Sequence, residues 1–247
     1  MKNASSGASV RAALLTCASM CAVSSVHAQN GTWIGTTSGT NWSDTANWSD
    51  NNADTIGDPP TAGGSANLST ADIPAVAFTV NLSAPVDVSQ IAFGDLDAVG
   101  TPGTWVVGGA SNLTLSGSAI LDTSVTTTIN SVITGSAGLT KAGAANLILT
   151  AANTFTGNVA VNAGQLTTKN GAALATSAVT LANGTHYRYE RAGNNSTFQG
   201  NAINVSPAST VTITSDNAGN GYSGVITADA NSVINIGSSG NLAQCSF

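Results

Sequence analysis

The chain is dominated by short segments in which aliphatic residues alternate with small polar ones, and glycine or asparagine separates one segment from the next. Residues 78–82 (FTVNL), 86–93 (VDVSQIAF) and 146–149 (NLIL) are examples. An alternation of period two sends one set of side chains to the core and the other to solvent, as in a β-strand. Glycine interrupts nearly every window that could form a helix. The sequence therefore predicts an all-β fold built from many short strands.

Several of these segments resemble one another, which favours a stacked repeat. Residues 109–115 (GASNLTL) return as residues 143–149 (GAANLIL), and residues 155–158 return as residues 198–201. In a parallel β-helix each coil buries its apolar face only against its neighbours. Only 7% of the residues are charged, which suits coils stacked about 4.8 Å apart, where aligned like charges would repel. We expect a right-handed parallel β-helix (solenoid) rather than a β-sandwich, the alternative with similarly short strands.

The first residues have the pattern of an export signal. A basic start at Lys2 is followed by apolar residues 10–23 and by a small-x-small cleavage site at residues 26–28. We therefore expect residues 1–28 to be a signal peptide that is cleaved between Ala28 and Gln29. The apolar run is too short and too rich in alanine and serine to span a membrane, which needs about 20 strongly apolar residues. No transmembrane segment is expected in the mature chain.

The mature chain would keep few basic residues and one cysteine. Its cations would be Lys141, Lys169, Arg188 and Arg191, against twelve acidic residues. Four scattered cations cannot form the positive face that binds phosphates, so a nucleic-acid partner is not expected. Cys245 would be the remaining cysteine, so no intrachain disulfide can form. Backbone pairing and an apolar core must therefore stabilise the fold.

Residues 138–166 carry the most specific motif of the chain. It starts with a Gly-Leu-Thr-Lys sequence, has an Asn-Thr-aromatic-Thr-Gly centre and finishes with Asn-Ala-Gly-x-Leu. The motif residues are Gly138, Leu139, Thr140, Lys141, Asn153, Phe155, Gly157, Asn162, Gly164 and Leu166. This unit resembles the autotransporter-associated β-strand repeat, also called the passenger-associated transport repeat. The resemblance implies a secreted β-helical passenger, located outside the cell or on the outer surface of a Gram-negative-type bacterium.

Residues 29–75 are rich in Trp, Asn, Asp and Gly and form a region of their own. Trp33, Trp42 and Trp48 lie in a stretch that resembles the segment often found ahead of such repeats. We expect an irregular Trp-rich N-terminal cap over residues 29–75, followed by a β-helical repeat region over residues 76–247. The three tryptophans would hide the open end of the solenoid. The alternative is that they form a carbohydrate platform.

An autotransporter carries a C-terminal translocator barrel, and this sequence gives no sign of one. About forty residues follow Val205, whereas eight tilted strands of about ten residues with their loops need more. We therefore expect a fragment that lacks the translocator barrel, or a family member that is simply exported.

Two further stretches are candidates for ligand binding. Asp50, Asn52, Asp54 and Asp58 have a spacing similar to that of a calcium loop, but the expected glycine and glutamate are missing. An acidic, solvated loop is the simpler interpretation.

The second stretch is residues 186–191 (HYRYER). As a strand it would place His186, Arg188 and Glu190 on one face and Tyr187, Tyr189 and Arg191 on the other. Exposed tyrosine and arginine side chains could stack on sugar rings or anchor a protein contact. The alternative is an ordinary outward strand with a local Arg–Glu pair.

Catalytic motifs find little support in the sequence. His186 would be the single histidine of the mature chain, and neither a nucleophile elbow nor a phosphate-binding loop occurs. No cofactor and no metal are expected. We expect a non-enzymatic secreted or cell-surface, structural or adhesin-like passenger module, with an unidentified surface glycan or protein as ligand. The alternatives are a carbohydrate-binding module that uses Tyr187, Tyr189 and the tryptophans, and a β-helical polysaccharide-degrading enzyme.

Overall fold

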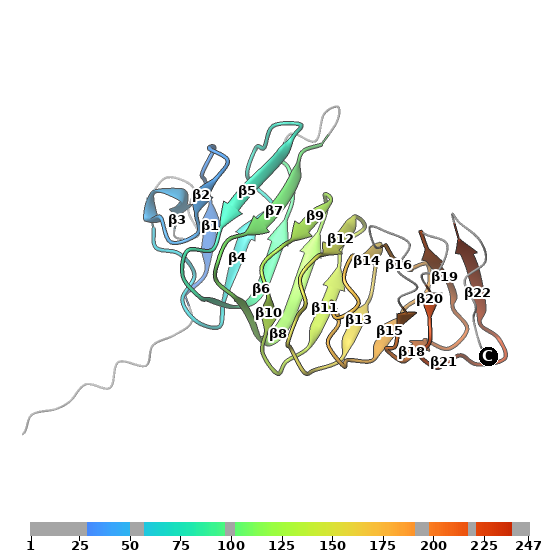
Figure 1. Ribbon diagram of the computed structural model, residues 1–247. Coiled ribbons are helices and arrows are strands. Elements are labelled where there is room, and N and C mark those ends of the chain that lie inside the picture. The colour runs from blue at the N-terminus through green and yellow to red at the C-terminus, as the bar shows by residue number, and fades with distance from the viewer. Residues whose placement is uncertain (1–28, 50–56, 97–101, 191–197, 217–220, 239–247) are drawn as a thin grey trace, which may run out of the picture.

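The alternating segments fold into short strands that pair in parallel with the strands of the neighbouring coils. The structure, a computed structural model, describes residues 29–49, 57–96, 102–190, 198–216 and 221–238. Its strands lie side by side from β1 at one end to β22 at the other, so the chain forms an elongated parallel β-solenoid (Figure 1). The predicted all-β parallel β-helix is confirmed, and its right-handedness stays a prediction.

Two long sheets and one short sheet account for the described strands. In spatial order, the first sheet consists of β3 (Trp48–Ser49), β1 (Gly31–Trp33), β4 (Gly64–Leu68), β6 (Val86–Phe93), β8 (Leu113–Thr123), β11 (Leu139–Ala142), β13 (Val159–Val161), β15 (Val179–Leu181), β18 (Ile203–Val205) and β21 (Ile226–Thr227), with β10 (Ile133–Thr134) also beside β8.

The second sheet runs along another side of the coils. It consists of β2 (Thr40–Asn41), β5 (Ala77–Asn81), β7 (Thr104–Gly108), β9 (Thr127–Ile129), β12 (Asn146–Leu149), β14 (Gln165–Thr168), β16 (His186–Tyr189), β19 (Thr210–Ser215) and β22 (Val233–Ser238). The short sheet pairs β17 (Phe198–Gln199) with β20 (Gly221–Tyr222). A single 3-10 turn, η1 (Thr45–Asn47), completes the described elements.

One coil in the middle of the solenoid takes 20 residues, since Leu139 pairs with Val159 and Val159 pairs with Val179. The similar segments 109–115 and 143–149 are therefore not stacked neighbours. The first leads into β8 of the first sheet, and the second forms β12 of the second sheet. Their similarity reflects the glycine-containing turn that precedes a strand in either sheet.

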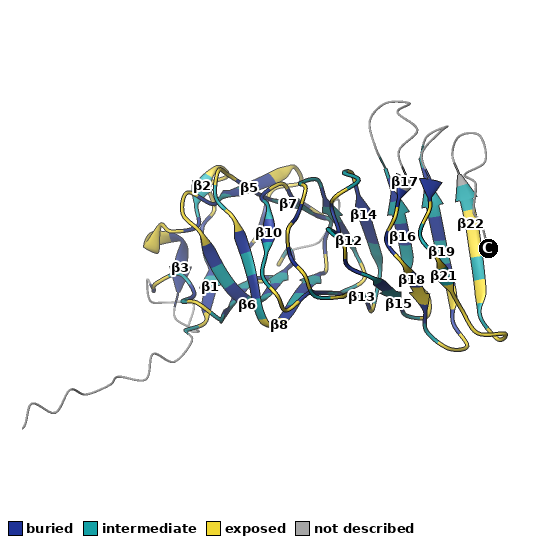
Figure 2. Cartoon of the chain, turned by 60° about the horizontal axis from the view of Figure 1, so that its bottom comes forward, coloured by how far each residue is buried: buried dark blue, intermediate teal, exposed yellow. Residues whose placement is uncertain are grey.

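Inward side chains form continuous columns along the solenoid, and outward positions are partly or fully exposed (Figure 2). Burying one large aliphatic side chain contributes about 1.5–3 kcal/mol, so the columns are the main source of stability. One column of the first sheet contains Ala66, Ile91, Leu121, Lys141, Val161, Leu181 and Val205. One column of the second sheet contains Phe78, Trp105, Thr127, Leu147, Leu166, Tyr187 and Ile213.

Aromatic rings fill the N-terminal coils. Trp33 packs edge-on against Trp48 and Trp105, with ring centroids 5.0 and 6.5 Å apart. β3 pairs antiparallel with β1 at the N-terminal end of the first sheet, and β1, β2 and β4 belong to the same two sheets as the later strands. The capping role of residues 29–75 and the boundary at residue 75 stay predictions.

The column model predicts opposite outcomes for two neighbours in β12. Leu147 is fully buried, whereas Ile148 faces outward and is partly exposed. Leu147→Ala should lower the free energy of unfolding by about 2–5 kcal/mol, because it leaves a cavity between coils. Ile148→Ala should cost about 1 kcal/mol or less. Chemical denaturation followed by circular dichroism measures both, and equal losses would contradict the alternation.

Candidate functional site

The glycines of the predicted repeat lie where two coils approach most closely. A Cβ on Gly138 would lie 2.2 Å from the carbonyl oxygen of Asn158, and Gly138 has a positive φ of 83°. A Cβ on Gly157, one coil further on, would lie 2.3 Å from the backbone nitrogen of Gly138. Both positions therefore require glycine, because a larger residue would separate the coils.

Lys141 occupies a core position and closes a corner. Its stem lies in the inward column between Leu121 and Val161. Its Nζ donates to the carbonyl oxygens of Ala142 and Gly143 at 2.6 and 2.7 Å, and to that of Ala163 in the next coil at 3.1 Å. Burial lowers the pKa of Lys141 to about 8, and the nearby Asp122 carboxylate acts in the opposite direction. The lysine of the motif is therefore a structural clamp between coils.

Asn153 makes a similar connection across three coils. Its Oδ1 accepts a hydrogen bond from the backbone nitrogen of Ile133 at 2.8 Å, and its Nδ2 donates to the carbonyl oxygen of Ala173 at 2.7 Å. The side chain is buried, so these bonds satisfy backbone groups that water cannot reach. Asn153 thus links the preceding coil to the following one.

The other motif residues also serve the coil. Leu139, Phe155 and Leu166 are buried in the core, whereas Thr140 and Asn162 face outward. Gly164 has a positive φ of 64°. The ten motif positions lie along two successive coils and their corners rather than around a pocket, and a binding role for them stays a prediction.

The predicted alternation in β16 is correct for the described residues. The outward face carries the histidine and the arginine, however, and not the tyrosine rings that a sugar-binding site would need. Tyr187 and Tyr189 are fully buried, whereas His186 and Arg188 are partly exposed. The alternative in which the two tyrosines are exposed binding residues is wrong, because they stack in inward columns and pack near Tyr222. Arg191 lies outside the described residues.

The outward face of β16 carries a network of ion pairs. Arg188 forms a two-pronged contact with Asp216 through its Nε and Nη2 atoms, and its Nη2 lies 3.5 Å from Oε2 of Glu190. Lys169 Nζ lies 3.0 Å from Oε1 of the same Glu190. The charges of this face therefore neutralise one another, as the ordinary interpretation of this strand predicts.

His186 belongs to the same face. Its Nε2 lies 2.7 Å from Oγ1 of Thr214. Burial and the neighbouring Arg188 lower the pKa of His186, and Asp216 opposes that change. The lowered pKa favours the neutral imidazole, which acts as a hydrogen-bonding group on the sheet surface.

The tryptophans do not form a carbohydrate platform. Trp33, Trp42 and Trp48 expose 1%, 3% and 0% of their surface. Trp48 Nε1 donates to the carbonyl oxygen of Trp42 at 2.6 Å, and Trp33 Nε1 donates to that of Gly35 at 2.9 Å. That alternative prediction is wrong, because flat sugar recognition needs exposed ring faces.

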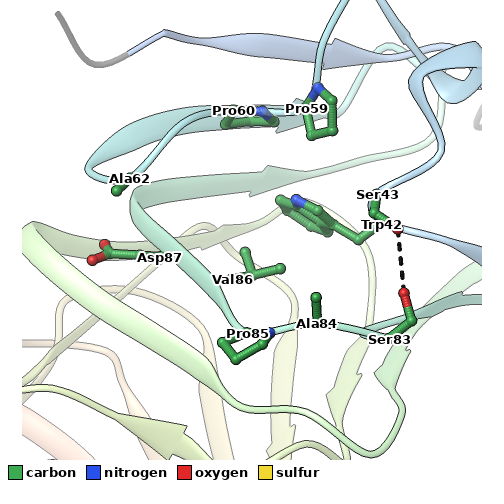
Figure 3. A pocket seen from close by; sticks show the side chains of 10 residues that line it. All are labelled: Trp42, Ser43, Pro59, Pro60, Ala62, Ser83, Ala84, Pro85, Val86 and Asp87. Atoms are coloured by element: carbon green, nitrogen blue, oxygen red, sulfur yellow. Dashed lines mark hydrogen bonds between the residues drawn. The ribbon is translucent and has the colours of Figure 1, made fainter. Parts of the chain in front are cut away.

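A pocket that the sequence did not predict opens near the N-terminal end of the solenoid. It holds about 250 Å³ and lies between segments 42–43, 59–62 and 83–87. Pro59 and Pro60 lie on one side and Pro85 and Val86 on the opposite side, with the edge of Trp42 between them (Figure 3). Its signals in the sequence are proline residues in two segments that only the coil brings together.

Polar groups mark two margins of this pocket. The hydroxyl oxygens of Ser43 and Ser83 lie 3.2 Å apart and close one end. Asp87 lies at another margin (Figure 3). Its Oδ1 accepts a hydrogen bond from the Ser116 hydroxyl at 2.6 Å. The pocket is therefore an apolar slot with a carboxylate at its rim.

The calcium-like stretch and the absence of a membrane span are two further predictions from the sequence. The calcium-like stretch lies mostly outside the described residues, with Asp58 exposed at its described end. Within the described ranges, no three His, Cys, Asp or Glu side chains gather closely enough to hold a metal ion. The described residues also contain no helix long and apolar enough to cross a membrane.

The predicted cleavage site lies at the edge of the described chain. Residues up to Ala28 lie outside it, and Gln29 donates through its backbone nitrogen to the Thr61 hydroxyl at 2.7 Å. Cleavage at this bond stays a prediction.

The buried lysine predicts an unusual pH dependence. Between about pH 8 and 10 the unfolded Lys141 keeps a proton that the folded residue has lost, so the free energy of unfolding should rise with pH. The expected gain from pH 8 to 9.5 is about 1.5 kcal/mol. Lys141→Met should abolish the gain, and urea titrations at several pH values measure it. A parallel pH dependence in the two proteins would contradict this ionisation.

The two asparagines of the motif provide a matched pair. Asn153→Ala removes two buried hydrogen bonds and should lower the free energy of unfolding by about 1–3 kcal/mol. Asn162→Ala, at an exposed position, should change it by about 0.5 kcal/mol or less. Denaturant titration of both variants tests the clamp, and the reverse order would refute it.

Comparison with known proteins agrees with the geometry. Residues 139–167 match the passenger-associated-transport-repeat model. The chain is 34% identical over 158 residues to the adhesin BmaC autotransporter of Brucella suis biovar 1 (strain 1330). That alignment covers 63% of this chain but 4% of the relative, so the chain spans a small part of that relative's length. No solved structure matches the chain significantly. The predicted resemblance to the passenger-associated transport repeat is confirmed by the match over residues 139–167.

Proposed function

We propose that this chain is a non-enzymatic, adhesin-like module that forms part of a bacterial surface structure. The observation that carries the proposal is the way the repeat is used: Lys141, Asn153 and the glycines hold coils together. A solenoid built in this way is a rigid, extended scaffold whose outward residues are free to contact a partner.

The comparisons support the surface location. A passenger repeat and the similarity to an autotransporter adhesin both belong to proteins outside the cell or on the surface of Gram-negative-type bacteria. The signal peptide predicted over residues 1–28 provides the export step. That the chain corresponds to a fragment of a longer passenger remains part of the proposal.

The charged groups support a non-enzymatic role. Lys169, Arg188, Glu190 and Asp216 form the described ion-pair network and satisfy one another. A polysaccharide-degrading site would instead need carboxylates aimed at an open cleft, with one of them available to transfer a proton. The carbohydrate-binding alternative loses the residues on which it rested, because the tyrosines and tryptophans are buried.

Display on a cell surface tests the proposal. A non-adherent bacterium that displays the full chain through a separate translocator should bind to animal-cell monolayers or immobilised extracellular proteins several-fold more than a strain displaying another β-solenoid. The physical reason is that the scaffold presents its outward surfaces many times per cell, which raises avidity.

The same strains allow the enzymatic alternative to be examined. Incubation of the displayed chain with a panel of uronic-acid and neutral polysaccharides should release no oligosaccharides. Measured depolymerisation would contradict the proposed function, as would adhesion that does not exceed that of the control strain.

A further inference from the structure

The N-terminal part of the chain has a strongly one-sided charge. No lysine or arginine occurs between residues 12 and 140, and nine of the twelve acidic residues of the chain lie in this stretch. The described ion pairs all lie beyond it, between Lys169 and Asp216. Apart from Asp122, which lies near Lys141, the carboxylates of the N-terminal coils form no ion pair among the described residues.

One of these carboxylates lines the pocket, and two others lie next to lining residues in the sequence. Asp87 lines it, Asp58 directly precedes Pro59, and Asp44 directly follows Ser43. The excess of carboxylates over cations in residues 12–140 gives the N-terminal coils a negative field, which favours a cationic ligand at the pocket that Asp87 lines.

The size and walls of the pocket indicate which kind of cationic ligand it can hold. Its volume of about 250 Å³ is below the roughly 300–1,000 Å³ of sites for drug-sized molecules, so it suits one side chain better than an oligosaccharide. Its walls are the rings of Pro59, Pro60 and Pro85 and the edge of Trp42. Such walls contact a long aliphatic stem well but offer few hydrogen bonds to sugar hydroxyls.

The walls are also fixed before any ligand arrives. Trp42 packs against Trp48 with ring centroids 4.8 Å apart, and its backbone nitrogen donates to the carbonyl oxygen of Asn81 at 2.8 Å. Val86 donates through its backbone nitrogen to the carbonyl oxygen of Asn112 at 3.1 Å. Binding here therefore costs little ordering of the protein, which raises affinity for a small contact.

We propose that this pocket binds a lysine or arginine side chain of a protein partner. The aliphatic stem lies against the proline and tryptophan walls, as such stems do on apolar surfaces. The charged end pairs with Asp87 at the rim, whose other contact is the Ser116 hydroxyl. The inference rests on the proposed adhesin-like function and names the chemistry of its partner.

Nuclear magnetic resonance of the full chain tests this directly. The probes are two short peptides, Gly-Ser-Lys-Ser-Gly and its norleucine analogue, which has the same stem without the charge. The lysine peptide should shift the Trp42 indole signal and the amide signals of residues 83–87. The norleucine peptide should bind about three- to fivefold more weakly, the range expected for a partly exposed ion pair.

Two variants separate the pocket from the general negative field. Asp87→Asn should lower the affinity for the lysine peptide about three- to fivefold and leave the affinity for the norleucine peptide unchanged. Asp72→Asn, an equal change of charge at an exposed position that does not line the pocket, should have little effect. Ala84→Trp, which adds a ring to an exposed position of the lining, should block both peptides.

Several results would overturn the proposal. These are an absence of shifts at the pocket signals with millimolar lysine peptide, equal binding of the two peptides, and equal effects of the two aspartate substitutions. An oligosaccharide that shifts the same signals at lower concentration would show the pocket to be a glycan site. If surface-displayed Asp87→Asn and Ala84→Trp chains keep full adhesion, the pocket is not the contact. The proposed adhesin-like function would then be kept and only the pocket proposal would be wrong. A lack of adhesion by the unmodified chain would contradict the proposed function itself.

Discussion

Parallel backbone pairing between successive coils is the constraint on which the rest of this structure depends. A 20-residue step brings Leu139 onto Val159 and Val159 onto Val179. Each strand then satisfies its backbone groups through the coils on both sides, and each inward side chain is packed between two others in its column. The fold thus needs no disulfide and few charges.

The exceptions to a purely aliphatic core follow from the same constraint. Coils can approach this closely only if the corners are narrow and their carbonyl groups are satisfied. Gly138 and Gly157 remove the steric obstacle, and the side chains of Lys141 and Asn153 bond to backbone groups of adjacent coils. The hallmark residues of the repeat therefore hold the coils together. Contact with a partner is left to residues that the motif does not specify.

The sequence predicted the strands and the repeat because both depend on local patterns. Alternation at residues 146–149 and the motif at residues 138–166 needed no knowledge of tertiary structure. Which face of β16 turns inward was harder to predict. Tyrosine and arginine are both amphipathic, and alternation alone does not say which of the two faces the core. The columns below and above Tyr187, which contain Leu166 and Ile213, decide that question.

The pocket could not be predicted for a different reason. Segments 42–43, 59–62 and 83–87 meet only because successive coils stack, and no single segment carries a recognisable binding motif. The absence of lysine and arginine from residues 12–140 was visible in the sequence. It indicates a cationic ligand only once the structure shows an apolar pocket in the same part of the chain. Scaffold and binding chemistry are thus encoded by different residues of the same coils.

Disulfide trapping tests the 20-residue stacking most directly. In a background with Cys17, Cys21 and Cys245 replaced by serine, cysteines would be introduced at outward positions 140, 160 and 180. Thr140 is the register partner of Ala160, and Ala160 that of Thr180, so adjacent pairs lie about 4.8 Å apart and the 140/180 pair about 10 Å apart. A disulfide needs a Cα separation below about 7 Å. The stacked solenoid predicts rapid oxidation of the 140/160 and 160/180 pairs and none of the 140/180 pair. Equal oxidation of all three pairs would contradict it.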